Sequence, residues 1–243
     1  MPADQKHKED GLYQRSFTVP ESWRGMKVRI VFDGSMTDTT VTVNGKSAGP
    51  THQGGFYRFH YDLTDIIQYG KSNQLAVLVS KDSANPSVEE AERKADFWVF
   101  GGIFRPVWLE ARPAQSIEWT ALDGKADGTL RAKVCLAGEG PADRLVMRVL
   151  TMAGEMIGKP LEAKIPAGEP VELEGRISGV LPWSVEDPQL YQVEVCLLAG
   201  ERVLHRTRER TGFRTLEVRP GQGVFINGSR LIVKGSQPPL FPP

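Results

Sequence analysis

The sequence predicts an all-β chain folded as two β-sandwiches. Short runs of alternating apolar and polar residues recur along nearly the whole chain, separated by turns rich in Gly and Pro. Their spacing of about ten residues is typical of antiparallel sandwiches rather than of a parallel sheet. Only one stretch, 85–94, has a convincing helical pattern. We place the junction between the two sandwiches near 112–116.

The first block contains six such runs, at 13–19, 26–32, 41–43, 56–61, 75–79 and 107–112. Asn44-Gly45 follows the third run and predicts a hairpin, because both central residues of a type I′ turn need positive φ. A single helical turn is expected after Asp62, whose side chain can cap it, and Gly70 is expected to end it.

The second block repeats the pattern, with runs at 117–122, 129–136, 144–150, 171–176, 191–198 and 203–210. A separate hairpin is predicted at 224–233, where Asn227-Gly228 provides the same turn chemistry. The last stretch, 237–243, contains four prolines, which suit neither a central strand nor a helix.

Composition narrows the classes of function. The chain has 30 Lys and Arg residues and 30 Asp and Glu residues, so it lacks the excess of positive charge that would indicate a nucleic-acid partner. The 40% apolar and 25% charged residues are typical of a soluble globular protein. No apolar run approaches the ~20 residues that span a bilayer, so no membrane partner is expected. The first ten residues are charged and do not resemble a signal peptide, which leaves the compartment open.

Two cysteines are too few for a disulfide scaffold or a zinc site. Cys135 and Cys196 both fall on the polar parity of their strands, which argues against a disulfide between sheets. We therefore expect two free thiols. No metal site and no cofactor are expected.

Catalytic motifs are absent from the sequence. It contains no Gly-x-Ser-x-Gly, no phosphate-binding glycine loop, no His-Glu-x-x-His and no Cys-x-x-Cys. The four histidines are scattered and are more typical of surface or turn positions than of ligands. No pair of carboxylates stands in a setting that indicates acid–base work.

One stretch, 96–109, needs a separate explanation. Asp96 precedes a run of aromatic residues that includes Trp98, and Gly101-Gly102 suggests a bulge or sharp bend before the strand that starts at Val107. The stretch is either a core corner filled with aromatic side chains or a place where Asp96 and Trp98 are displayed for binding. The residues alone favour the first interpretation, since aromatics in β proteins pack more often than they bind.

Six motifs occur in the order in which they occur in glycoside hydrolase family 2, the β-galactosidases, β-glucuronidases and β-mannosidases, which this sequence resembles. Gly101-Gly102-Ile103-Phe104-Arg105-Pro106-Val107 is similar to the Gly-Gly-Ile-x-Arg-x-Val signature of the family. The other motifs are found at 11–17, 41–46, 52–64, 183–214 and 225–235.

The resemblance implies a jelly-roll sugar-binding domain at 1–115, an immunoglobulin-like sandwich at 116–218, and a hairpin with a tail at 219–243 that leads into a (β/α)₈ barrel. In the family the barrel carries two catalytic glutamates. Only about 25 residues follow the second sandwich in this chain, against the ~200 or more that a barrel requires. No Asn-Glu dipeptide matches the acid/base glutamate of the family, so no catalytic residue is assigned.

The resemblance assigns few binding residues to this sequence. The resemblance implies that Asp96 binds the sugar of the terminal subsite and that Trp98 is an aromatic neighbour in that subsite. Whether a metal assists at Asp96 stays open. We expect Arg105 to make an internal ion pair that fixes the bend, and His52 with Gly54-Gly55 to form a turn supporting the same edge.

The favoured hypothesis is therefore the non-catalytic N-terminal part of a family 2 glycosidase, inactive alone and with a carbohydrate as its partner. One alternative is a free-standing carbohydrate-binding module. Another is a structural remnant whose exposed surface mediates association.

Overall fold

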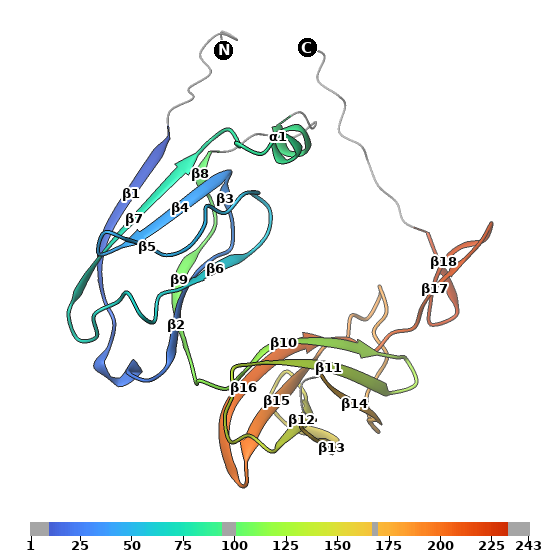
Figure 1. Cartoon of the computed structure of the whole chain (residues 1–243). Helices are drawn as coiled ribbons and strands as arrows, with labels where there is room; N and C mark the ends of the chain where they lie inside the picture. Colours follow the sequence, from blue (N-terminus) through green and yellow to red (C-terminus); the bar gives the residue numbers. More distant parts are fainter. Residues whose placement is uncertain (1–9, 94–100, 167–169, 233–243) are drawn as a thin grey trace. The chain divides into compact units, whose positions relative to one another are not determined.

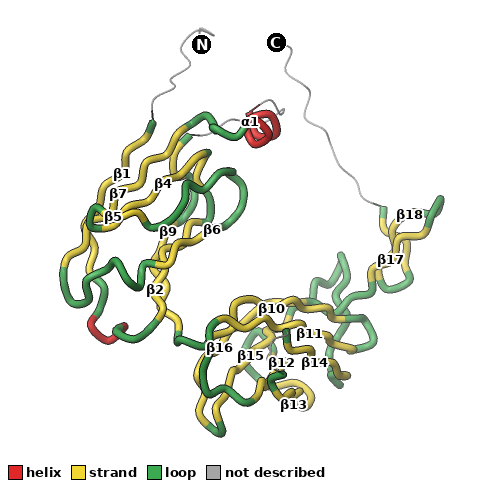
Figure 2. Tube along the Cα trace, viewed as in Figure 1, coloured by secondary structure: helices red, strands yellow, loops and turns green. Residues whose placement is uncertain are grey.

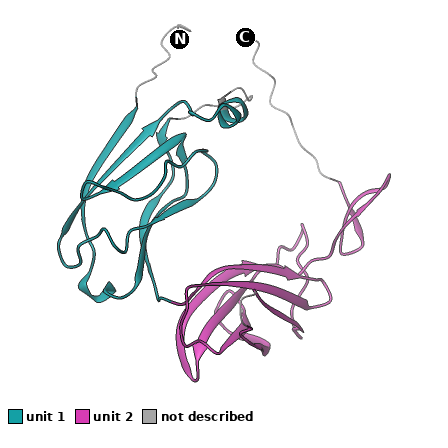
Figure 3. Cartoon of the chain, viewed as in Figure 1, with its two compact units in different colours: residues 1–114 teal, residues 115–243 magenta. Residues whose placement is uncertain are grey.

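The computed structural model describes residues 10–93, 101–166 and 170–232. The chain forms two compact units, unit 1 at 1–114 and unit 2 at 115–243 (Figure 3). Strands dominate both units (Figure 2), and the described residues include one α-helix, so the all-β prediction is confirmed for them. None of the helices described is long and apolar enough to span a membrane.

Unit 1 is a sandwich of two antiparallel sheets (Figure 1). The first sheet has the order β1 (Gly11–Thr18), β7 (Ser72–Ser80), β4 (Asp38–Val43), β5 (Lys46–Ser47). The second has the order β6 (Phe59–Asp62), β2 (Lys27–Phe32), β9 (Val107–Arg112). Two short strands, β3 (Ser35–Met36) and β8 (Gly102–Ile103), pair with each other. The 3₁₀-helix η1 (Glu21–Trp23) joins β1 to β2, and α1 (Pro86–Arg93) follows β7.

The core of unit 1 follows the predicted alternation. Val28, Ile30 and Phe32 of β2 point inward and are almost completely buried. They face alternate residues of the first sheet, among them Val41 and Val77. Each side chain of this size contributes about 1.5–3 kcal/mol on burial, so this interior is the main stabilising element of the sandwich.

A groove of about 1040 Å³ opens between β1 and β9, the edge strands of the two sheets. The buried side chains of Ile30 and Phe32 lie behind its lining. The hydroxyl of Tyr13 closes one end by accepting the amide of Ile103 at 3.3 Å. Because side chains alternate along β1, Arg15 points to the same inner side as Tyr13. An inward-pointing charge on an edge strand disfavours pairing with a further strand.

Asn44-Gly45 forms the predicted hairpin turn, with φ of 53° and 76°. The Asn44 side chain also bonds to neighbouring loops. Its Nδ2 donates to Ile66 O at 3.1 Å and to Oδ1 of the fully buried Asn73 at 2.8 Å, and its Oδ1 accepts the Gln74 amide at 2.9 Å. The turn residue therefore joins the hairpin to the loop at Ile66 and to the start of β7.

Unit 2 is a second antiparallel sandwich. One sheet has the order β10 (Ser116–Gly124), β11 (Thr129–Ala137), β14 (Val171–Arg176). The other has the order β13 (Met156–Lys164), β12 (Arg144–Leu150), β15 (Tyr191–Ala199), β16 (Arg202–Thr211). A small third sheet contains β17 (Leu216–Arg219), β18 (Gly223–Ile226) and β19 (Ser229–Leu231).

The motif residues of unit 2 lie together. The rings of Tyr191 and Phe213 meet edge to face at 5.5 Å, and the Tyr191 hydroxyl accepts the amide of Leu181 at 2.7 Å. Trp183 packs against Gly212, where a Cβ atom would come within 2.9 Å of the indole. Glycine is therefore required at 212 by close approach rather than by its backbone angles.

Strand β13 was not predicted. Gly158, with φ of 67°, and Pro160 interrupt its pattern, and the pairing with β12 shifts register between Met147 and Val149. An edge strand tolerates such residues because one side of its backbone needs no partner strand. Strand β17 was also missed, since four residues are too short for a clear alternation.

Both cysteines are free thiols and face away from the main core, as predicted. Facing away from the main core does not expose Cys196, which is 1% exposed. It packs with Val146 and Leu198 on the other face of the sheet. Burial raises the pKa of the Cys196 thiol above its ordinary value.

We predict that Asn44→Asp destabilises unit 1 by roughly 1–3 kcal/mol. Asp-Gly suits the same turn, but a carboxylate cannot donate to Ile66 O or to Asn73. Urea unfolding of the chain measures the loss, with Lys46→Gln on the same hairpin as the control. Equal stability of wild type and Asn44→Asp would mean that Asn44 acts only through its backbone angle.

Candidate functional site

Asp96 and Trp98, the two sugar-binding residues predicted from the sequence, lie outside the described residues. The structure describes both flanks of their segment. Helix α1 precedes it, and β8 with the turn into β9 follows it. We name the region formed by these flanks and the loop at 52–57 the corner of unit 1.

Helix α1 begins as its sequence predicts. Oδ1 of Asn85 accepts the amide of Ser87 at 3.0 Å, which caps the first turn. The other end is held by Glu92, which is 9% exposed. Both of its oxygens accept the amide of Gly55, at 3.0 and 2.9 Å. This contact fixes the helix against the loop at 52–57.

Asp38 holds the same loop from the other side. Its carboxylate accepts hydrogen bonds from Gln53 Nε2 at 3.0 Å, Ser83 Oγ at 2.7 Å and Ala84 N at 2.8 Å, and the residue is 8% exposed. Asp38 and Glu92 are thus two buried carboxylates whose oxygens are occupied by donors from the protein. Such carboxylates fix loops and are poorly placed to transfer protons to a substrate.

His52 is packed into this loop as an aromatic side chain. It stacks on Phe59 with ring centroids 3.6 Å apart, and Tyr57 meets it edge-on at 5.3 Å. Its Nε2 donates to Gly54 O at 2.9 Å. Burial lowers the pKa of His52, despite the opposing effect of that hydrogen bond, so the neutral ring is favoured.

The paired glycines of the loop are required by space and by backbone angle. Gly54 has φ of 114°, and the Tyr57 hydroxyl, which donates to Gln53 O at 2.7 Å, lies directly beside it. A Cβ atom on Gly55 would come within 2.8 Å of Met36. The turn expected at His52 and Gly54-Gly55 is present, and Glu92 and Asp38 hold it from two sides.

Contrary to expectation, Arg105 makes no ion pair with any residue that the structure describes. Its Nη1 donates instead to two backbone carbonyls, Asp33 O at 3.3 Å and Phe56 O at 3.2 Å. The carboxylate of Asp33 forms an ion pair with Arg58 Nε at 2.6 Å. Arg105 therefore joins the turn after β8 to two loops through their backbone, while Gly102, with φ of 80°, makes the bend.

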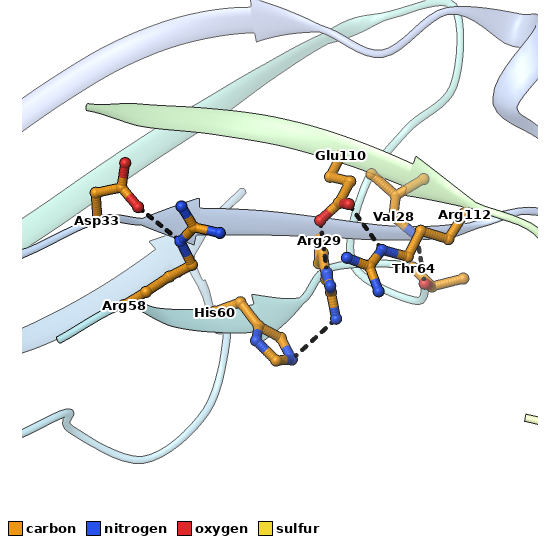
Figure 4. A network of polar contacts seen from close by, with 8 residues as sticks. All are labelled: Val28, Arg29, Asp33, Arg58, His60, Thr64, Glu110 and Arg112. Carbon is orange, nitrogen blue, oxygen red and sulfur yellow. Dashed lines mark hydrogen bonds and ion pairs between the residues drawn. The ribbon is translucent and has the colours of Figure 1, made fainter. Parts of the chain in front are cut away.

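A second polar network covers the outer face of the sheet β6-β2-β9 (Figure 4). Glu110 accepts hydrogen bonds from Arg29 Nε at 2.9 Å and from Arg112 Nε at 2.7 Å, and His60 contacts Arg29. Burial alone would raise the pKa of Glu110, but the bonds from Arg112 and Arg29 outweigh it and lower the pKa. Glu110 is thus an ionised structural group and no proton donor.

The described residues do not form a catalytic or metal centre. No group of three or more His, Cys, Asp or Glu side chains could hold a metal ion within the part of the chain that the structure describes. Retaining glycoside hydrolysis needs two free carboxyl groups about 5 Å apart. Asp38 and Glu110 are each engaged by several donors instead, and both oxygens of Glu92 accept the Gly55 amide.

Sequence reasoning missed Asp38 and Glu92, although each leaves a signal. A glutamate in the last turn of a helix is disfavoured by the helix dipole, which indicates a specific partner for Glu92. An aspartate at the start of the apolar strand β4 likewise indicates a buried acceptor. Neither signal reveals which loop is held, because the partners are 37 and 45 residues away in the sequence.

We predict that Glu92→Ala destabilises unit 1 by about 1–3 kcal/mol, because the buried Gly55 amide loses its acceptor. The exposed Ser87→Ala on the same helix is the control and should change little. Urea unfolding measures both variants. A loss no larger for Glu92→Ala than for Ser87→Ala would contradict the structural role of Glu92.

The neutral His52 ring also predicts a pH dependence. Its pKa in the folded state lies below the ordinary value of 6.5, so its contribution is present above that pH and is lost as the pH falls from 6.5 through the lower folded-state pKa. The free energy of unfolding of unit 1 should therefore fall as the pH is lowered below 6.5. His52→Gln should flatten this slope. An unchanged slope would show that other groups cause it.

Comparison with known proteins gives a consistent result over both units. Residues 1–113 match the model of the glycosyl hydrolases family 2 sugar binding domain, and residues 116–214 match a second model described as glycosyl hydrolases family 2. A β-galactosidase of Thermoanaerobacter pseudethanolicus is 28% identical over 92% of this chain, and a putative β-glucuronidase of Formosa agariphila is also 28% identical. The chain spans 31% and 27% of these two relatives.

Solved structures agree. A β-glycosidase from Bacteroides vulgatus superposes with a TM-score of 0.75 at 26% identity, covering 93% of this chain and 28% of that protein. A β-glucuronidase from Ruminococcus gnavus, in complex with D-glucuronic acid, gives a TM-score of 0.75 at 24% identity and shares the fold. With both units matched in order, this chain belongs to glycosyl hydrolases family 2 and corresponds to the sugar-binding and immunoglobulin-like domains of its members.

Proposed function

We propose that this chain is the part of a family 2 glycosidase that helps to bind the sugar and does not cut it. The match of residues 1–113 to a sugar binding domain is the observation that carries the proposal. The two carboxylates of the corner are both engaged in holding loops, which supports the absence of hydrolytic chemistry in this part of the molecule.

The proposed sugar contacts are Asp96 and Trp98. A carboxylate accepts hydrogen bonds from sugar hydroxyls, and an aromatic face packs against the apolar side of a pyranose ring. Glu92 holds the helix on one side of this pair, and Arg105 holds the turn on the other. Flanks fixed in this way are what a binding segment needs in order to lose little entropy when it meets its ligand.

In this proposal the chain is inactive alone and completes a sugar subsite together with a catalytic domain. The β-galactosidase and β-glucuronidase relatives suggest a galactoside or a glucuronide as the substrate of the whole enzyme. We therefore predict no hydrolysis of nitrophenyl β-galactoside, β-glucuronide or β-mannoside by the purified chain. Turnover above background that is abolished by Asp96→Ala would overturn the proposal.

A free-standing carbohydrate-binding module is the second candidate, favoured by the compactness of unit 1. Titration calorimetry with galactose and glucuronic acid separates the two. We expect no heat at millimolar sugar, because the subsite is shared with the catalytic domain. Binding that is lost in both Asp96→Ala and Trp98→Ala would establish the module instead. Trp119→Ala, at a 46% exposed position in unit 2, is the matched control.

A further inference from the structure

Five arginines gather on the outer face of the sheet β13-β12-β15-β16 in unit 2. The core-facing residues of β12 and β15, such as Leu145 and Val195, alternate with residues that point the other way. The strand register aligns Arg148 and Arg208 with Glu194, Arg206 with Cys196, and Arg210 with Gln192. We name this surface the arginine face and define it by Arg144, Arg148, Arg206, Arg208 and Arg210.

One carboxylate lies at the centre of the arginine face. Glu194 is 4% exposed and lies 3.3 Å from Arg148 Nη1, 3.6 Å from Arg206 Nε and 2.8 Å from Arg208 Nη2. Burial alone would raise the pKa of Glu194, but the bond from Arg208 and the charges of Arg206 and Arg208 outweigh it and lower the pKa. A single negative charge thus meets three guanidinium groups.

Positive charge is therefore left in excess. Arg144 has acidic neighbours of its own, Glu201 at 2.9 Å and Glu162 at 3.8 Å. Arg210 is exposed and forms no ion pair with any residue that the structure describes. The whole chain is electrically neutral, so this face is a local segregation of charge and not a consequence of composition. Such a patch attracts an anionic partner.

The shape and chemistry of the arginine face restrict the kind of anionic partner that it can bind. Within the described chain the outward residues of β12, β15 and β16 include no aromatic side chain, so the face offers no platform for stacking bases or neutral sugars. Alternate arginines along β16 are spaced by about 7 Å, which forms a straight row. A guanidinium binds a carboxylate through parallel N–H groups, and Glu194 is a carboxylate already held by these arginines.

We propose that the arginine face binds a polyuronate, a polysaccharide whose sugars carry carboxylate groups. Successive carboxylates pair with the exposed guanidinium groups along β16, and Glu194 keeps those groups extended and aligned. This site is in unit 2 and is independent of Asp96 and Trp98, so either proposal can fail without affecting the other.

The test measures binding of a polygalacturonate of defined length to the full chain by calorimetry, at ionic strengths of about 0.02 M and 0.3 M. Arg206→Gln/Arg210→Gln leaves Arg148 and Arg208 on Glu194. We expect binding that is strong at low salt and weakened by added salt. The double variant should bind about tenfold more weakly, as the loss of two exposed ion pairs implies.

The matched control is Arg131→Gln/Lys133→Gln, which removes the same charge from exposed positions on β11 in the other sheet. It should bind as the wild type does. Equal weakening in both double variants would reduce the effect to net charge and overturn the proposal. So would an absence of binding at low salt, equal affinity for a neutral galactan, or tighter binding of a single-stranded nucleic acid of equal charge.

A second variant covers the case in which the glutamine variant does not fold. Arg206→Lys/Arg210→Lys keeps both charges but lacks the planar fork, so it should bind several-fold more weakly than wild type. Unchanged affinity in that variant would contradict recognition through paired hydrogen bonds.

Discussion

The corner of unit 1 depends on the contact between the Glu92 carboxylate and the amide of Gly55. That amide belongs to a loop whose backbone bonds to β4 only at His52, within the described residues, and a buried amide without an acceptor costs free energy. Glu92 supplies the acceptor from helix α1, and Asp38 supplies three more bonds at the next turn of the same region. The helix, the glycine pair and the packed His52 ring are arranged around these two carboxylates.

Side chains also satisfy backbone groups of loops elsewhere in the chain. Asn227, in the second Asn-Gly turn, donates to Trp183 O at 2.9 Å and accepts the Thr215 amide at 2.9 Å. Asn44 does the same for Ile66 O and for the Gln74 amide at the start of β7, and Arg105 donates to two loop carbonyls. In each case a side chain satisfies backbone groups that the sheets leave unpaired, so the family signatures at these positions have a structural cause.

Much of this fold is predictable from local pattern, because side-chain alternation in strands and positive φ in Asn-Gly turns are local properties. The core of β2 and both hairpins follow from these rules alone. Strand β13 does not, since Gly158 and Pro160 hide its alternation. The burial of the Cys196 thiol does not follow from parity either, because Val146 and Leu198 pack beside it on the outer face. The partners of Asp38, Glu92 and Arg105 were beyond prediction, as they lie far away in the sequence.

The candidate site, too, was only partly predictable from the sequence. The resemblance identified Asp96 and Trp98, which fall outside the described residues, whereas the carboxylates that hold the flanks of that segment emerged only from the structure. The arginine face likewise depends on strand register, because three strands bring together charges that a neutral composition conceals.

Hydrogen exchange of the Gly55 amide tests the role of Glu92 most directly. A clamp that is integral to unit 1 predicts that this amide exchanges only when the whole unit unfolds, with the same free energy as the amide of Ile30 in the middle of β2. Exchange as fast as that of the exposed Gly45 amide would show that the loop opens by itself, and would contradict a central role for the Glu92 contact in the corner of unit 1.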